Sequence, residues 1–350
     1  MTQAKLPNRP IIFSDETAAS VLIRAAEANG HTSVYQLLSG TGIKINELSL
    51  KACLVDPLRY RQIIRAIGLG EDAAARALER TGTSRNSPRR YRSMTIMDQC
   101  FRRNDASAFC SQCLEEHAYW RQQWLVRPFS ACINHKCLLL DCCLECGKIP
   151  SIARGKLTSC NHCRASLLTM RGPNINVSSL VEVQRMLDSN QSDSLNIVFE
   201  FWNALRRFDG EGDQPAVEHV RLNASVSFAL DQVDAINHVA TLVKQRLSLL
   251  HPRIQLVPFI SSNAQLKRFA EKIIDIVPPM PKIGTGLSPD AKLSKVEVCR
   301  VFDISPARLA DLIESGNLKW PKNGNRQRKV AVAEVEFILH GFSAAEREIA

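Results

Sequence analysis

The chain has 350 residues, enough for two or three domains with buried cores, and a formal net charge of +10. This charge suits a polyanionic partner, whether DNA, RNA or a ribonucleoprotein. Glycine and proline, 16 of each, are too few for a disordered or fibrous chain, and no apolar run is long enough to span a membrane. The N-terminal stretch lacks the apolar core of a signal peptide, so we expect a cytoplasmic protein. Apolar residues recur mostly at helical spacing, which predicts a mainly α fold.

Residues 1–103 are predicted to form an N-terminal helical domain, because short apolar stripes at helical spacing end repeatedly at glycine. The expected helices span residues 14–30, 34–40, 57–68 and 71–82. The first helix would begin at an N-cap, Ser14, with Asp15 and Glu16 close to its positive end. Short helices separated by glycine suit a helix-turn-helix-like domain, and a helical bundle that binds no nucleic acid fits them equally well.

The end of this domain is rich in arginine. Residues 83–103 contain six arginines and one acidic residue, Asp98. The six are Arg85, Arg89, Arg90, Arg92, Arg102 and Arg103. Such a run is commonly a solvated linker, but Tyr91 lies within it and metal ligands follow directly. We therefore predict that these arginines contact nucleic-acid phosphates or a protein partner.

Four pairs of soft metal ligands follow, and each pair has two residues between its members. The first pairs are Cys110, Cys113, Cys132 and His135, and the second pairs are Cys143, Cys146, Cys160 and Cys163. A two-residue gap lets a tight turn direct both donors at one tetrahedral ion, so residues 104–172 are predicted to be a tandem zinc-finger module with two zinc ions. Each ion would have four protein ligands and no open position for water, which favours a structural role over catalysis.

Other uses of the cysteines are weaker. A disulfide framework needs an oxidising compartment, which nothing in the sequence indicates. Cys142 could replace Cys143, but only Cys143 keeps the two-residue gap and is followed by a knuckle with Gly147. The other cysteines outside the ligand set are Cys53, Cys100, Cys137 and Cys299. All of these except Cys137 are predicted to be small buried residues.

An aromatic segment lies between the first two ligand pairs. Its rings belong to Tyr119, Trp120, Trp124 and Phe129. We expect them to pack beside the metal sites as a small core; stacking on nucleic-acid bases is the alternative.

Residues 173–280 are predicted to be a second helical domain. The expected helices span residues 179–187, 195–208, 231–250 and 264–277. They carry no ligand cluster and no catalytic constellation, so we assign them to a core and to interfaces, with oligomerisation as a reasonable use.

Residues 281–350 are predicted to end the chain as a winged helix-turn-helix. A helix through residues 296–301 would be followed by a turn and by a reader helix that has Ser305 as N-cap and ends near Gly316. A basic hairpin with its tip at residues 323–324 and a closing helix from about residue 333 would complete the wing. The predicted contact residues are Arg308 on the reader helix and Lys322, Arg326, Arg328 and Lys329 on the wing. The reader helix has few cations, which leaves a protein-binding use open.

Three stretches together resemble the TniQ/TnsD family of transposition target-selection proteins. The likeness of the N-terminus rests on Pro10, Asp15, Glu16, Arg24 and Gly30. Residues 110–147 resemble the family's zinc signature, and the C-terminal helix-turn-helix is similar to that of short members. Residues 178–281 carry little of the likeness.

The resemblance implies an adaptor, because members of this bacterial family mark a target and recruit an AAA+ ATPase regulator, TnsC or TniB, without cutting DNA. Short TniQ members of CRISPR-associated (type I-F) transposons dock as a homodimer on an RNA-guided Cascade complex with its crRNA and target DNA. Long TnsD members bind a fixed DNA site directly. The length of this chain and its modest reader helix are closer to the short kind, and direct sequence-specific DNA binding, as a TnsD-like selector or a regulator, is the alternative. The sequence has no GxxxxGK[ST] loop, and we predict that the chain is not an enzyme.

Overall fold

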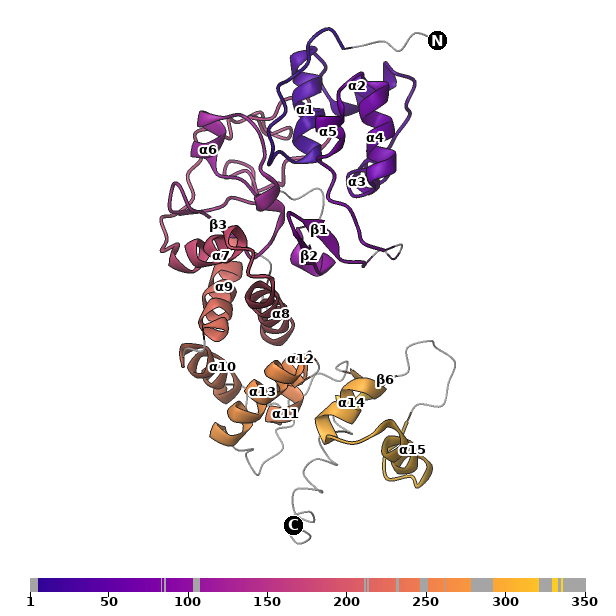
Figure 1. Cartoon of the computed structure of the whole chain (residues 1–350), viewed down its shortest axis with the longest axis vertical. Helices are drawn as coiled ribbons and strands as arrows, with labels where there is room; N and C mark the ends of the chain where they lie inside the picture. The colour runs from indigo at the N-terminus through magenta and orange to yellow at the C-terminus, as the bar shows by residue number, and fades with distance from the viewer. Residues whose placement is uncertain are drawn as a thin grey trace. The chain divides into compact units, whose positions relative to one another are not determined.

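The computed structural model of the chain describes residues 6–82, 84, 86–102, 108–210, 212, 214–230, 233–245, 251–260, 262–277, 292–320, 329–332 and 335. The chain forms two compact units, one of residues 1–199 and 212–226 and one of residues 200–211 and 227–350. As predicted, the fold is mainly α-helical; the described residues contain 15 α-helices and three small two-stranded sheets (Figure 1). No helix in the described part of the chain has the length and apolar character needed to cross a membrane.

The first unit opens with short helices. They are α1 (Ala18–Ala28), α2 (Val34–Ser39), α3 (Glu47–Cys53), α4 (Pro57–Ala66) and α5 (Glu71–Ala74). The predicted N-cap of the first helix is wrong, because Thr17 caps α1 by accepting a hydrogen bond from the backbone N–H of Ser20. Asp15 and Glu16 precede this cap, and the buried Glu16 binds Arg24 in place of the helix end. The helix α3 was not predicted.

The rest of the first unit contains the predicted zinc module and later helices. Its elements are β1 (Arg89–Tyr91), β2 (Met94–Ile96), the 3-10 helices η1 (Asp98–Cys100) and η2 (Gln122–Leu125), α6 (Ser111–Glu116), β3 (Ala131–Cys132), β4 (Cys137–Leu138), α7 (Ser178–Asp188) and parts of α8 (Ser192–Asp209) and α9 (Pro215–Ala229). The strands β1 and β2 form an antiparallel hairpin inside the arginine-rich run, with Tyr91 opposite Met94 and both buried. This run is therefore an ordered hairpin in its middle and not a linker.

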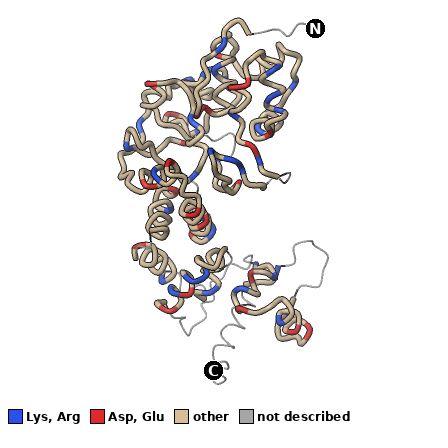
Figure 2. The backbone as a smooth tube through the Cα atoms, viewed as in Figure 1, with Lys and Arg blue, Asp and Glu red and all other residues tan. Residues whose placement is uncertain are grey.

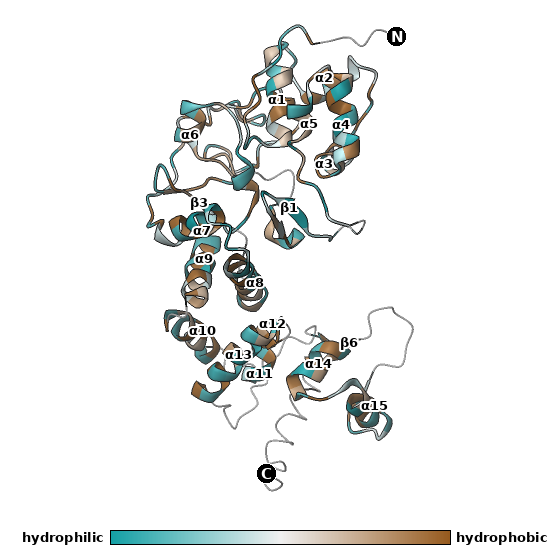
Figure 3. Ribbon diagram, viewed as in Figure 1, coloured by the Kyte–Doolittle hydropathy of each residue, from teal (hydrophilic) through white to brown (hydrophobic). Residues whose placement is uncertain are grey.

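One hydrophobic core joins the N-terminal helices to the metal-ligand region. Leu22 of α1 and Ile64 of α4 belong to the same buried cluster as Trp120, Leu157 and Leu167. The predicted segments 1–103 and 104–172 therefore share a core. On α4 apolar and polar positions alternate at helical spacing, so one face of the helix is buried and the other is exposed (Figure 3).

The helix α9 was missed because its sequence has no clear amphipathic period. Polar as well as apolar side chains of this helix are buried, among them Glu218, His219 and Leu222. A helix that is covered on several sides does not need the one-sided apolar stripe by which helices are found in a sequence.

The second unit contains the rest of α8 and α9 and the C-terminal elements. These are α10 (Asp234–Gln245), α11 (Pro252–Gln255), α12 (Val257–Ile260), α13 (Ala264–Ile276), β5 (Lys292–Ser294), α14 (Lys295–Phe302), α15 (Pro306–Glu314) and β6 (Lys329–Ala331). Its core includes a cluster of phenylalanines in which Phe201 stacks on Phe228 and meets Phe269 edge to face.

The C-terminal helices agree with the sequence in their local structure. Ser294 and Glu297 form a reciprocal capping box at α14, and Ser305 caps α15, whose first residue is Pro306. The strand β6 pairs with β5, which places Val330 opposite Leu293. The tip of the predicted wing hairpin and residue 333, where the closing helix was expected to begin, lie outside the described residues.

Candidate metal centres and basic surfaces

The first predicted ligand set comes together at one point. Cys110 precedes α6, Cys113 lies within it, Cys132 ends β3, and His135 lies in the turn before β4. The four ligand atoms all lie within 4.8 Å of one another. The Sγ atoms of Cys113 and Cys132 are 3.5 Å apart, and the Nδ1 atom of His135 lies 3.3–3.4 Å from all three sulfurs.

These distances fit a zinc ion. With Zn–S bonds of about 2.3 Å, the corners of a tetrahedron of sulfurs are roughly 3.8 Å apart. A tight Cys3His set of soft donors is the usual donor set of a structural zinc. The thiols also show what a cation would change: hydrogen bonds from the thiols of Cys113 and Cys132 lower the pKa of Cys110, and the hydrogen bond with Cys110 raises the pKa of Cys113. One thiolate is thus shared among neutral thiols, and a divalent cation would favour ionisation of all of them.

His135 is held for this role by a carboxylate. Its Nε2 atom lies 2.9 Å from Oε1 of Glu116 at the end of α6. An N–H at Nε2 that donates to this carboxylate leaves the lone pair on Nδ1, the atom that faces the sulfurs. Glu116 was not identified from the sequence, although its position just after the second cysteine of the module could have suggested it.

The second predicted ligand set also comes together. The Sγ atoms of Cys143 and Cys163 are 3.6 Å apart, and those of Cys146 and Cys160 are 3.8 Å apart. These four residues form the second metal-ligating cluster of the described residues, and Cys142 is not part of it. Burial raises the pKa of Cys160, but hydrogen bonds from backbone N–H groups at residues 163 and 162 outweigh this effect and lower it to about 7. The cluster can therefore hold a second zinc with four sulfurs.

A fifth thiol lies beside the first set. The Sγ atom of Cys137, at the start of β4, is 3.8 Å from Sγ of Cys110 and is buried. Hydrogen bonding to Cys110 and burial raise the pKa of Cys137. It is a neighbour of one ligand only, because the cluster of mutually close ligand atoms does not include it.

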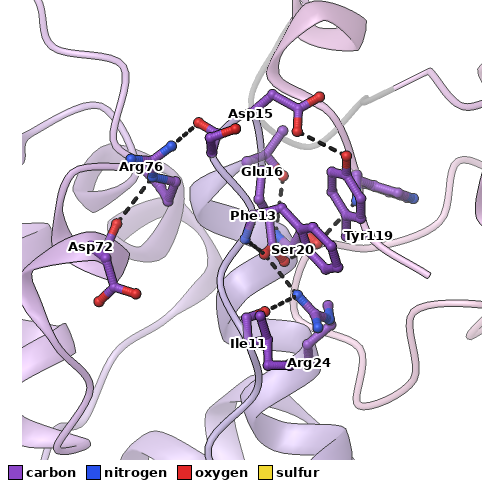
Figure 4. A network of polar contacts seen from close by, with 12 residues as sticks. Ile11, Phe13, Asp15, Glu16, Ser20, Arg24, Asp72, Arg76 and Tyr119 are labelled. Atoms are coloured by element: carbon purple, nitrogen blue, oxygen red, sulfur yellow. Dashed lines mark hydrogen bonds and ion pairs between the residues drawn. The ribbon is translucent and has the colours of Figure 1, made fainter. Parts of the chain in front are cut away.

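The N-terminal residues that carry the family resemblance form a buried polar network (Figure 4). Glu16 is fully buried and accepts hydrogen bonds from Arg24 Nη1 at 2.7 Å and from the Ser20 hydroxyl at 2.7 Å. The same Ser20 hydroxyl accepts from the backbone N–H of Trp120, and the Phe13 ring stacks on Tyr119 with ring centroids 4.1 Å apart. The network therefore fastens the N-terminal segment to the aromatic segment of the first ligand module.

Asp15 strengthens the same connection. It accepts a hydrogen bond from the Tyr119 hydroxyl at 2.8 Å and lies 3.3 Å from Nη1 of Arg121 (Figure 4). Burial, followed by the hydrogen bond to Asp15, raises the pKa of Tyr119 to about 12, so this hydroxyl remains a donor at neutral pH. Asp15, Glu16 and Arg24 thus act in the structure as positioning residues between two segments.

The aromatic segment packs as predicted. Tyr119, Trp120, Trp124 and Phe129 are all buried. The guanidinium of Arg154, from the second ligand module, lies 4.2 Å from the Trp120 ring centre and donates to backbone carbonyls at residues 151, 156 and 157. Burial lowers the pKa of Arg154 to about 9. The second module is therefore anchored to the first through a buried cation and an aromatic ring.

The arginine-rich segment divides into buried and exposed residues. Arg89 is buried and lies 2.6 Å from Asp98, and Arg102 is buried against Glu218 of α9. The structure thus places these two guanidinium groups inside the protein and not on the surface predicted for them. Burial lowers the pKa of Arg89, and the charge of Asp98 opposes this effect. Glu218 also receives Arg127 at 3.3 Å, so one carboxylate holds two arginines.

Two arginines of the segment are exposed. Arg90 lies 3.7 Å from Glu79, and Arg92, in the turn of the β1–β2 hairpin, lies 3.3 Å from Asp188 of α7. Exposed pairs of this kind are weak and can exchange for other anions. Arg85 and Arg103 lie outside the described residues.

Of the C-terminal candidates, Arg308 and Lys329 are exposed, on α15 and at the start of β6. Lys322, Arg326 and Arg328 lie outside the described residues. Figure 2 shows that basic and acidic positions are mixed along the described helices, so the net charge is spread over the chain.

The comparisons with known proteins give one match. Residues 7–139 match the family model TniQ. The matched region contains the N-terminal helices, the polar network and the whole first ligand set, and it ends before the second set. The match supports the resemblance to the TniQ family for this part of the chain and associates it with target selection in transposition. No curated protein matches the sequence.

Proposed function

We propose that this chain is a non-catalytic adaptor that selects the target of a DNA transposition reaction. In this proposal it docks as a homodimer on an RNA-guided Cascade complex, so that the crRNA identifies the target, and recruits the AAA+ regulator TnsC. Two structural zinc ions hold its two ligand modules. The contact surfaces on both partners would be formed by exposed side chains around a rigid first unit.

The observation that carries the proposal is the position of the TniQ match. Residues 7–139 coincide with helices and a four-ligand cluster that share one core and one buried polar network. A rigid unit with saturated metal sites supports binding better than chemistry, because a catalytic zinc needs a position for water or substrate. Fold and match together support an adaptor, and the choice of partners is the inferred step.

Direct DNA recognition is the second candidate, and one observation favours it. The helices α3 and α4 are connected by three residues, which is the connection length of a helix-turn-helix motif. A selector that used this motif would bind a defined DNA site without a guide complex.

Co-elution distinguishes the two candidates. Zinc-loaded full-length chain is mixed with the Cascade complex encoded beside it and analysed by size exclusion at 0.1 M salt, with and without target DNA. We expect a stable complex that contains two copies of the chain. If the chain elutes alone at low salt and instead gives a footprint on one duplex that resists moderate salt, direct recognition replaces docking.

TnsC recruitment is tested separately with TnsC and ATP in place of Cascade. A TnsC–chain complex that forms on DNA supports the adaptor role with either kind of target recognition. Absence of any complex with TnsC in the presence and absence of DNA would overturn the adaptor role itself.

A further inference from the structure

The exposed face of α4 carries basic residues that the sequence analysis did not single out. Leu58, Arg61, Gln62 and Arg65 follow helical spacing on one side of the helix, and all four are exposed. The side chains of Arg59, Arg61 and Arg65 are 65%, 44% and 61% exposed. These residues face solvent with three formal positive charges over ten residues of helix.

The opposite face of α4 is fixed to the core. Tyr60 and Ile64 are fully buried, and the Tyr60 hydroxyl donates to a backbone carbonyl of α1. The connection from α3 consists of Leu54 and Val55, which are buried, and Asp56, whose side chain caps α4. The helix is therefore held rigidly, and its second position after a three-residue turn is that of the helix that enters the major groove in helix-turn-helix proteins.

The present partners of these arginines are exposed carboxylates. Arg61 and Arg65 both bind Glu71, at 3.2 and 2.9 Å, and Arg59 lies 3.3 Å from Asp56. Because exposed pairs contribute little to stability, a phosphate can replace these carboxylates at small cost. Glu71 then acts as a competitor for an incoming anion.

The helix α15 at the other predicted helix-turn-helix lacks this character. Its exposed residues include Arg308, Asp311 and Glu314, so acidic groups outnumber basic ones there. Charge complementarity to a polyanion therefore favours α4 over α15.

We propose that the outer face of α4 binds duplex DNA, with Arg61 and Arg65 on backbone phosphates and Gln62 toward the base edges of the major groove. The inference rests on the proposed function for its purpose, because a target selector of either kind works beside duplex DNA. The binding surface itself stands on the geometry of α3 and α4.

The test uses zinc-loaded full-length protein and a fluorescein-labelled 30-base-pair duplex of arbitrary sequence, with affinity measured by fluorescence anisotropy between 0.05 and 0.2 M salt (about one order in affinity per contact over such ranges). Two variants change the proposed surface in opposite directions: Arg65→Ala removes a phosphate contact, and Glu71→Gln removes the competing carboxylate. Two matched variants, Arg185→Ala and Glu182→Gln, change an exposed pair on α7 in the same way.

We expect Arg65→Ala to bind roughly fivefold to tenfold more weakly at 0.1 M salt, with a salt slope lower by about one, because one phosphate contact is lost. Glu71→Gln should bind at least about threefold more tightly, since it frees two arginines. A variant that merely failed to fold could not bind more tightly, so the gain separates binding from stability.

The inference is overturned if the α4 variants change affinity no more than the α7 variants, or if the unaltered chain does not bind duplex DNA at 0.05 M salt. These results do not affect the co-elution with Cascade or TnsC, which therefore judges the proposed function independently.

Discussion

The Nε2 atom of His135 lies 2.9 Å from a carboxylate oxygen of Glu116, while its Nδ1 atom faces three cysteine sulfurs. The carboxylate fixes the tautomer and the orientation of the imidazole that a metal at this point requires. We expect Glu116→Gln to weaken zinc binding at the first site about 10-fold to 100-fold, as loss of such a partner commonly does. Competition with a chromogenic chelator measures this affinity.

Glu115→Gln is the matched control, because Glu115 is the adjacent carboxylate and binds the exposed Arg171 at 3.1 Å instead of a metal ligand. Equal zinc affinities of the Glu116 and Glu115 variants would show that the carboxylate has no influence on the site.

The two ligand sets should be independent in metal content and coupled in stability. Cys113→Ala or Cys160→Ala should lower the zinc content from about two ions per chain to about one, because each removes a ligand from a different set. Both should also lower the melting temperature, since Cys113 and Cys160 belong to the core that contains the N-terminal helices. Metal analysis and circular dichroism give the two readouts.

Cys142→Ala should retain the metal content of the unaltered chain, because Cys142 lies outside the second cluster. Loss of one zinc from this variant and not from Cys143→Ala would reverse the ligand assignment.

The buried pair in the N-terminal network should be costly to break. Arg24→Met leaves the fully buried Glu16 carboxylate without its cation, and removal of one partner from such a pair commonly costs about 3–5 kcal/mol of the free energy of unfolding. Denaturant unfolding of the full chain measures the loss. In contrast, Arg185→Met at an exposed pair should leave the unfolding midpoint almost unchanged; similar losses in both variants would contradict a special role for Glu16.

His219 should make stability depend on pH. Burial lowers its pKa below the ordinary value of 6.5, although a hydrogen bond to the Asn176 carbonyl opposes this effect. The unfolded chain therefore takes up a proton at a higher pH than the folded chain, and stability falls as the pH decreases below about 6.5. We expect His219→Gln to have a shallower loss of melting temperature between pH 7 and 5.5 than the unaltered chain, with zinc content measured at each pH. Parallel curves for the two proteins would remove His219 from the account.

The ligand sets could be predicted fully from the sequence, because a two-residue gap between soft donors imposes a local turn whatever the surrounding fold. Long-range partners could not. Glu16 was predicted to lie near a helix end, but its partner Arg24 is eight residues away and Ser20 joins it to Trp120. Only packing of two distant segments decides that Glu16 is buried.

The basic residues show the same limit in another form. Arg89 and Arg102 stand in a conspicuous run and are buried, because hairpin β1–β2 and helix α9 bring carboxylates to them. Arg61 and Arg65 stand apart in the sequence and are exposed on one helix face. Their four-residue spacing was visible, but a count of charges along the chain favours runs over faces.

The most direct test of the account is the position of insertions in a transposition reaction reconstituted with this chain, Cascade, TnsC and the transposase. Insertion sites are sequenced with two guide RNAs that match different targets. The account predicts that insertions move with the guide and disappear when this chain is omitted. Insertions that stay at one site with either guide, or that continue without the chain, would contradict it.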